Sequence, residues 1–129
     1  AAGLQQGLRA GRIRKVMGGG MRQSGYLAAA AIYALDNNIN RLKEDHARAR
    51  ILGETLKSLS YVEDMLSVDT NILIFTLSDK VKSDDFIKKL AEANIKVVGF
   101  GKQTIRFVTH LDFNDGMLEK VVSVLKKII

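Results

Sequence analysis

The chain has 129 residues, a formal net charge of +6 and no cysteine. This length allows one domain with a hydrophobic core, and the lack of cysteine excludes a disulfide framework and thiolate metal sites. No apolar run approaches the roughly 20 residues that a bilayer-spanning helix needs, and no secretory signal pattern is visible, so we expect a cytoplasmic protein without a membrane partner.

The positive charge is concentrated at the start of the sequence. Residues 1–22 contain no acidic residue and five basic ones, Arg9, Arg12, Arg14, Lys15 and Arg22. Five of the six net positive charges therefore lie in this segment, which leaves +1 for the remainder. A basic segment of this kind is compatible with nucleic acid or another anionic partner.

Three consecutive glycines, residues 18–20, interrupt this basic segment. Each glycine costs about 1 kcal/mol relative to alanine in a helix interior, so we expect a short basic helix over residues 9–17 and an irregular connection over residues 1–8. A glycine run that leads into a helix leaves unpaired N–H groups near the positive end of the helix dipole, and Arg22 adds a planar guanidinium there. This arrangement predicts an anion site; the alternative is a flexible hinge with solvated charges.

The next helix is expected over residues 26–35, from Tyr26 onward, where the sequence is almost wholly apolar and rich in alanine. A helix that is apolar all round is normally buried, and so short a chain offers little to cover it. We therefore expect this helix to pack against another domain or subunit.

Residues 36–38 interrupt the apolar pattern. Apolar residues then recur every three or four positions over residues 42–59 and predict an amphipathic helix of about five turns. Within it we expect an exposed ion pair between Glu44 and Arg48. His46 lies on or near the apolar face and is expected to be structural rather than catalytic.

The second half of the sequence predicts strands and two helices, after a connection over residues 61–70. Three segments predict strands: residues 71–77, 95–100 and 104–109. A helix between the first two strands is expected to begin at Ser83 as its cap and to end at Asn94. A last helix is expected to begin at Asn114 and Asp115.

The order of these elements predicts the topology. With a right-handed crossover, the strand at residues 104–109 lies between the other two strands, in an antiparallel sheet with helices on one face. We therefore predict a two-layer α+β fold with a three-stranded antiparallel sheet, preceded by two long helices. The central strand carries Arg106, which is expensive to bury without a partner, so from the residues alone an ion pair with a nearby acid is the simplest expectation.

Two blocks of the sequence resemble a known family. Residues 15–25, Lys-Val-Met-Gly-Gly-Gly-Met-Arg-Gln-Ser-Gly, and residues 105–112, Ile-Arg-Phe-Val-Thr-His-Leu-Asp, are similar in order and separation to segments of low-specificity threonine aldolases. These enzymes are pyridoxal-phosphate lyases of fold type I within the beta-eliminating lyase family. The resemblance covers nearly the whole chain except the first eight residues.

This resemblance implies that the chain is the C-terminal portion of such an enzyme, because no lysine here has the sequence context of the cofactor lysine found in the upstream domain of the family. Residues 1–25 would then be a basic segment and glycine-rich connection. Residues 26–60 would be a helical segment that links to the missing large domain. Residues 61–129 would form the small C-terminal domain, with the order βαββα.

The resemblance also implies a function for the intact enzyme, namely cleavage of L-threonine and allo-threonine to glycine and acetaldehyde with pyridoxal phosphate as cofactor. Arg106 would bind the α-carboxylate of the amino-acid substrate, and His110 would have a supporting or structural role. Arg22, with Lys15, would face the cofactor phosphate across a subunit boundary.

The family's catalytic groups and any metal ligands are not expected in this chain, which we expect to be inactive alone. A homo-oligomer is expected to form through residues 26–35 and the neighbouring helices, without a nucleic-acid partner. Two other interpretations stay open: nucleic-acid binding by the basic segment, and a non-catalytic oligomerisation or regulatory module.

Overall fold

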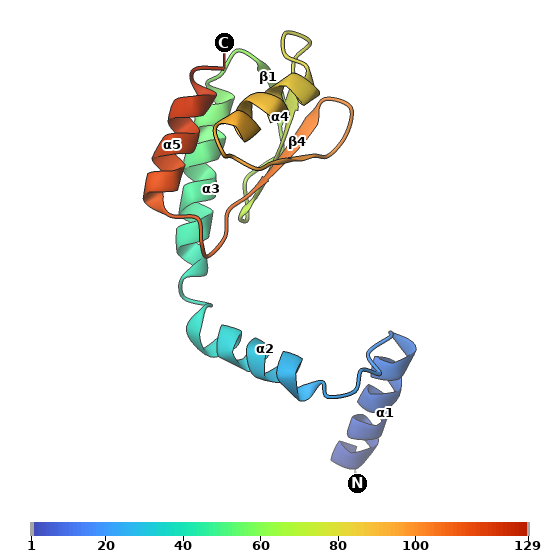
Figure 1. Ribbon diagram of the computed structural model, residues 1–129. Helices are drawn as coiled ribbons and strands as arrows, with labels where there is room; N and C mark the ends of the chain where they lie inside the picture. The colour runs from blue at the N-terminus through green and yellow to red at the C-terminus, as the bar shows by residue number, and fades with distance from the viewer. Residues whose placement is uncertain (1, 129) are drawn as a thin grey trace. The chain divides into compact units, whose positions relative to one another are not determined.

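The computed structural model describes residues 2–128 and divides into two compact units (Figure 1). The first unit ends at Ile39 and the second begins at Asn40. No helix in the described range is long and apolar enough to cross a membrane.

The first unit begins with α1 (Ala2–Val16), which is longer than the helix expected over residues 9–17. Residues 2–8, expected to be irregular, are helical instead. Alanine, leucine and glutamine favour a helix even where no face is buried, and this local preference outweighs the lack of an apolar period.

Glycine residues end α1. The N–H groups of Gly18 and Gly19 donate to the carbonyl oxygens of Lys15 (3.1 Å) and Arg14 (2.7 Å), and Gly18 has a left-handed φ of 81°. These are the hydrogen bonds of a Schellman C-cap, and a Cβ on Gly19 would come within 2.8 Å of the Arg14 carbonyl oxygen. The expectation that the glycine run leads directly into a helix start is therefore wrong, because two of its N–H groups close α1.

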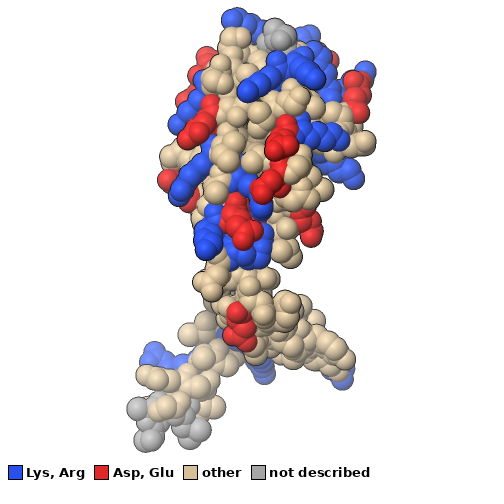
Figure 2. All heavy atoms as spheres, turned by 90° about the vertical axis from the view of Figure 1, so that its left-hand side faces the viewer, with Lys and Arg blue, Asp and Glu red and all other residues tan. Residues whose placement is uncertain are grey.

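The second helix of this unit, α2 (Gly25–Asn37), contains no buried residue. Tyr26 is 82% exposed, and the other large apolar side chains of α2 are exposed as well. The surface of α2 is almost free of charge (Figure 2), since Asp36 is its only charged residue. Within the described chain, the predicted apolar helix is present but lacks the cover that such a helix normally has.

The second unit contains a four-stranded antiparallel sheet in the order β1-β2-β4-β3. Its strands are β1 (Val62–Met65), β2 (Ile72–Leu77), β3 (Val98–Gly99) and β4 (Thr104–Val108). The position of β4 between β2 and β3 confirms the predicted arrangement of the last three strands. The number of strands was wrong, because β1 occupies part of the segment expected to be a connection.

The strand β1 was missed because it is a short edge strand with two acidic residues in its middle, Glu63 and Asp64, and an irregular register beside Val62. Such a segment lacks the apolar alternation by which a strand is recognised. The expected strand over residues 95–100 is shorter than predicted, since only Val98 and Gly99 pair with β4.

Three helices pack on the sheet: α3 (Leu42–Lys57), α4 (Ser83–Glu92) and α5 (Asp115–Leu125). Three helices precede the sheet, as expected, but α1 is as long as the two helices that were expected to be long. The core consists of apolar side chains from all three packed helices and from alternate positions of β2 and β4, including Leu52, Leu56, Leu73, Phe75, Phe86, Leu90, Ile105, Phe107 and Leu125. The aromatic rings of Phe75 and Phe107 meet edge to face, with 5.1 Å between their centroids. The prediction of helices on one face of an antiparallel sheet is thus confirmed.

Of two helix starts predicted from local sequence, the structure confirms one and corrects the other. The predicted start of α5 is confirmed, and the side chain of Asn114 caps this helix by accepting a hydrogen bond from the N–H of Met117 (3.0 Å). Ser83 is not the cap of α4 but its first residue, and its N–H donates to Oε1 of Gln103 (3.1 Å). A side chain distant in sequence thus replaces the expected local cap.

The second face of the sheet is not part of this core. Its residues are partly or fully exposed, and we call it the open face: Ile72, Ile74, Thr76, Thr104, Arg106 and Val108. Because β4 is a central strand, a side chain on this face is surrounded by neighbouring strands on both sides.

Candidate functional site

Arg106 lies in the middle of the open face. The register pairs it with Ile74 of β2 on one side and Val98 of β3 on the other. Its Nε atom is buried and has no hydrogen-bond partner among the described residues. None of the ion pairs found in residues 2–128 involves Arg106, so the ion pair expected from the residues alone is not formed.

The environment of Arg106 favours an external anion. Its strand neighbours are apolar, and its guanidinium carbon lies 5.6 Å from the centroid of the Phe100 ring. A partly buried guanidinium without an acidic partner is energetically costly. A carboxylate can satisfy it with two parallel hydrogen bonds. A hollow on the same face is lined by Ile74, Thr76 and Phe100 together with the acidic Asp64, and Arg106 is not among its lining residues.

Lys15 and Arg22 both belong to the first unit. Lys15 lies in the last turn of α1, and Arg22 lies in the turn that precedes α2. Both side chains are exposed and form no ion pair with the residues described. The segment contains no acid that could compete for them, so these cations fit an anionic group such as a phosphate.

The fit to a phosphate depends on side chains rather than on the glycines. The N–H groups of Gly18 and Gly19 are occupied in the cap of α1. By contrast, α2 begins without a side-chain cap at Ser24, and its positive end is close in sequence to Arg22. Arg22 and Lys15 lie in one unit and Arg106 in the other.

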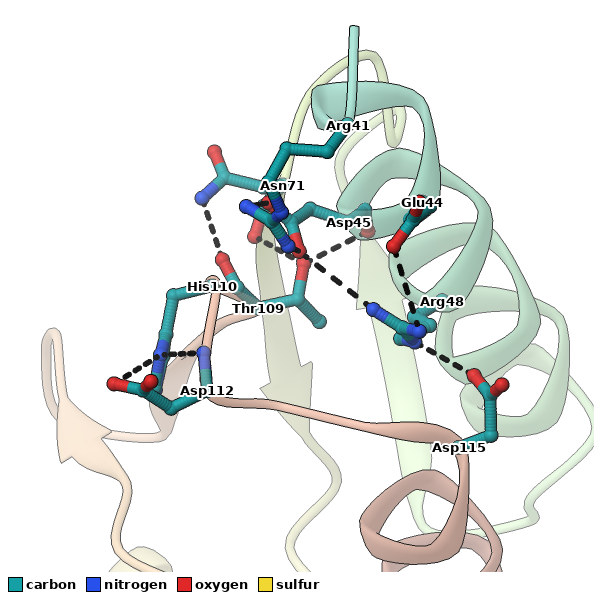
Figure 3. Close-up of polar contacts among 9 residues, drawn as sticks. All are labelled: Arg41, Glu44, Asp45, Arg48, Asn71, Thr109, His110, Asp112 and Asp115. Carbon is teal, nitrogen blue, oxygen red and sulfur yellow. Dashed lines mark hydrogen bonds and ion pairs between the residues drawn. The ribbon is translucent and has the colours of Figure 1, made fainter. Parts of the chain in front are cut away.

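A buried acid that sequence analysis did not single out is Asp45, in the first turn of α3. It is 3% exposed, and both of its carboxylate oxygens accept hydrogen bonds from Arg41, each at 3.0 Å (Figure 3). Arg48 lies 3.9 Å from the same carboxylate. The spacing of four residues between Arg41 and Asp45 is a helical ion-pair signal, and it could have been noticed.

Hydrogen bonds connect Asp45 to the end of β4. The Thr109 hydroxyl donates to the Asp45 carbonyl oxygen (2.8 Å), and the Asn71 side chain donates to the Thr109 carbonyl oxygen (2.6 Å). Thr109 follows the strand that carries Arg106. This polar cluster therefore ties the start of α3 to the central strand of the candidate site.

Arg48 connects the same helix to α5. Its Nε donates to Asp115 at 2.7 Å, whereas its predicted partner Glu44 lies 3.9 Å away. The hydrogen bond to Asp115 is the main cause of a raised pKa of Arg48. The expected pair with Glu44 is present, but it is not the exposed pair that was predicted, since the Arg48 side chain is only 14% exposed and its shorter contact is with Asp115 of α5.

Neither histidine forms a hydrogen bond or ion pair with Arg106 among the described residues. His110 is largely exposed, and its Nδ1 accepts a hydrogen bond from the N–H of Asp112 at 3.2 Å (Figure 3). His46 is partly buried on α3. The geometry therefore gives Arg106 as a candidate carboxylate ligand and Arg22 with Lys15 as candidate phosphate ligands.

Comparisons with known proteins point to one family. A family model described as beta-eliminating lyase matches residues 8–80. A low-specificity L-threonine aldolase of Escherichia coli is 39% identical over 115 residues, which is 89% of this chain and 33% of that protein. A probable low-specificity L-threonine aldolase of Arabidopsis thaliana is 35% identical over 119 residues, 90% of this chain and 34% of the relative. The chain thus spans about a third of the length of these relatives.

Solved structures resemble the fold. A cystine C-S lyase, C-DES, in complex with its product cysteine persulfide, has a TM-score of 0.62 at 19% identity over 79% of this chain and 28% of that chain. The histidinol-phosphate aminotransferase of Clostridium acetobutylicum has a TM-score of 0.57 at 15% identity, over 71% and 29% of the two chains. Both likenesses show that the α+β fold is shared with part of these enzymes.

Proposed function

The chain belongs to the beta-eliminating lyase family, and from this premise we propose that it is the C-terminal part of a pyridoxal-phosphate-dependent aldolase. The intact enzyme would cleave L-threonine and allo-threonine to glycine and acetaldehyde. The relatives do not favour nucleic-acid binding or a purely regulatory module. The observation that carries the proposal in this chain is the unpaired, partly buried guanidinium of Arg106 on the open face.

Arg106 would bind and orient the substrate. Two parallel hydrogen bonds from its guanidinium to the α-carboxylate fix both the position and the rotation of the amino acid. The rotation decides which bond to Cα is aligned for cleavage. A lysine could supply the charge but not the two-pronged geometry.

Arg22 and Lys15 would contribute positive charge to the site of the cofactor phosphate. Their exposure, the absence of acids from residues 1–22 and the nearby start of α2 support this role. Of the two, Arg22 has the stronger support, because it lies in the turn just before α2 and its planar guanidinium can bind two phosphate oxygens. When bound, pyridoxal phosphate supplies the electron sink for the cleavage. The residues of this chain would bind the cofactor phosphate and orient the substrate.

We further propose that the chain alone does not cleave threonine. It spans only about a third of the length of its aldolase relatives, and none of its lysines has the sequence context of the lysine that binds the cofactor covalently in the family. Incubation with pyridoxal phosphate followed by borohydride reduction should leave no adduct at a single stoichiometric lysine. Specific trapping together with threonine cleavage would overturn this part of the proposal.

The exposed apolar surface of α2 is proposed to pack against a second copy of the protein or the remainder of the enzyme. A helix of this composition is rarely left in water, and large apolar patches mark interfaces. The side chains available for this contact include Tyr26, Leu27, Ile32, Tyr33 and Leu35. This surface is therefore the part of the chain that we expect to mediate assembly.

A chimera tests the proposed function directly. This chain would replace the segment that it matches in the Escherichia coli low-specificity L-threonine aldolase, and the same enzyme without that segment would be the control. The chimera should bind pyridoxal phosphate and produce glycine from L-threonine, and the truncated control should not. A folded chimera that binds the cofactor but does not cleave threonine contradicts the proposal.

A further inference from the structure

Phe100 lies against the arginine of the candidate site. Its ring centroid is 5.6 Å from the guanidinium carbon of Arg106. The backbone N–H of Phe100 donates to the Thr104 carbonyl oxygen (2.8 Å), which fixes the residue in the hairpin between β3 and β4. The side chain is nevertheless 57% exposed, so it contributes little to the hydrophobic core.

We propose that Phe100 is a positioning residue, which holds the Arg106 guanidinium by a cation–π contact and presents its fork to a carboxylate. The attraction arises because the electron-rich face of an aromatic ring favours a nearby cation. This inference depends on the carboxylate-binding role proposed for Arg106. Phe100 would hold the Arg106 side chain in its binding orientation before the carboxylate binds.

A second arginine in the same unit, Arg41, shows why it matters that Arg106 is positioned by an aromatic ring rather than by an acid. Arg41 is fixed by Asp45, whose two oxygens occupy both Nη atoms at 3.0 Å. An arginine held in this way is neutralised, and its fork is not free for a second carboxylate. The ring of Phe100 has no hydrogen-bond acceptor of that kind, so Arg106 keeps its charge and its donors.

No hydrogen bond to Nε and no ion pair among the described residues holds the Arg106 side chain in place. Its strand neighbours Ile74 and Val98 are apolar, and its Nε atom has no hydrogen-bond partner in the described part of the chain. Without the ring, the end of the side chain beyond the buried Nε atom would have more rotamers open to it. Part of the binding free energy would then be spent on ordering it.

Nuclear magnetic resonance of the full 129-residue chain tests this role. Acetate, the simplest carboxylate, would be titrated at constant ionic strength while the Nε–H signal of Arg106 and the backbone amide signals of Ile74 and Val98 are followed. From the strength of exposed cation–π contacts, Phe100→Leu should weaken acetate binding by about two- to fivefold. Phe100→Tyr keeps an aromatic face and should bind acetate like the wild type.

Leu111→Ala is the matched control. Leu111 is 58% exposed, almost the same as Phe100, but it lies beyond the end of β4 at Val108 rather than in the hairpin between β3 and β4. Its replacement should leave acetate affinity unchanged. A loss of affinity in Phe100→Leu, restored in Phe100→Tyr and absent in Leu111→Ala, supports positioning by the ring rather than a general effect on folding.

Arg106→Lys separates this inference from the function on which it rests. If the backbone signals of Arg106→Lys report wild-type acetate affinity, the carboxylate role of the arginine fails, and the inference about Phe100 fails with it. If Arg106→Lys loses binding but Phe100→Leu binds like the wild type, only the positioning role of Phe100 is overturned.

Discussion

Replacing Asp45 by asparagine should lower the free energy of unfolding of the second unit by about 2–3 kcal/mol. The carboxylate is 3% exposed and accepts two hydrogen bonds from Arg41 at 3.0 Å. Hydrogen bonds to charged groups contribute about 1.5–3 kcal/mol each, and breaking a fully buried ion pair costs about 3–5 kcal/mol. The side chains of Arg41 and Arg48 are 18% and 14% exposed, so they can regain some hydration when the carboxylate is lost. The expected loss of unfolding free energy is therefore smaller than the cost of breaking a fully buried ion pair.

Urea denaturation followed by circular dichroism measures this change, and thermal unfolding should show a decrease of about 10–20 °C in Tm for a unit of this size. Glu44→Gln is the control on the neighbouring position of the same helix. Its side chain is 51% exposed and lies 3.9 Å from Arg48, so its loss should change the free energy of unfolding by at most about 0.5 kcal/mol. Equal effects of the two substitutions would refute the reasoning that burial makes Asp45 the important acid.

Three further predictions follow from local features of the fold. Burial raises the pKa of Tyr61 to about 12, and its hydroxyl donates to the Leu125 carbonyl oxygen (2.8 Å). Because this pKa is higher in the folded than in the unfolded protein, the protonated hydroxyl stabilises the fold fully below about pH 10, and this contribution is lost as the pH rises through 12. The free energy of unfolding should therefore fall over this range in the wild type, and a fall of the same size in Tyr61→Phe would contradict the assignment. Asn114→Ala removes the cap on the Met117 N–H and should cost about 1 kcal/mol in urea denaturation, whereas Asn114→Asp should retain the cap; an unaffected alanine variant would show that the cap is unimportant. Ile32→Glu places a charge on α2 and should shift the chain towards monomer in sedimentation, a prediction that fails if the wild type is itself monomeric at high micromolar concentration.

The parts of the fold that were predicted from sequence depend on local signals. The start of the last helix was placed at Asn114 and Asp115 from their residue types and their position before an apolar helix pattern, and the structure confirms it. The central place of β4 followed from element order and the handedness of crossovers. The edge strand β1 was missed because two acids, Glu63 and Asp64, interrupt its apolar pattern.

The site depends on contacts that the sequence does not specify. From the residues alone, Arg106 was expected to form an ion pair, but the sheet register places it beside Ile74 and Val98. Asp45 illustrates the same limit, because its burial depends on contacts with distant segments as well as on its neighbour Arg41. The residue pattern therefore pointed to Arg22 beside the glycine run, and the family resemblance pointed to Arg106, whereas the register and packing determine whether each arginine has an acidic partner.

The assay that tests the central claim most directly is a comparison of Arg106→Lys and Arg22→Ala in the chimera with the Escherichia coli enzyme. Cofactor content and kcat/KM for L-threonine would be measured on the same samples. Arg106→Lys should retain pyridoxal phosphate and lose roughly ten- to a hundredfold in kcat/KM, because it cannot form both hydrogen bonds to the carboxylate. Arg22→Ala should instead lose cofactor first, and under the proposed subunit assembly it should lose more of it on dilution. Wild-type kcat/KM for threonine in Arg106→Lys would contradict the account, since the guanidinium of the central strand would then have no part in holding the substrate.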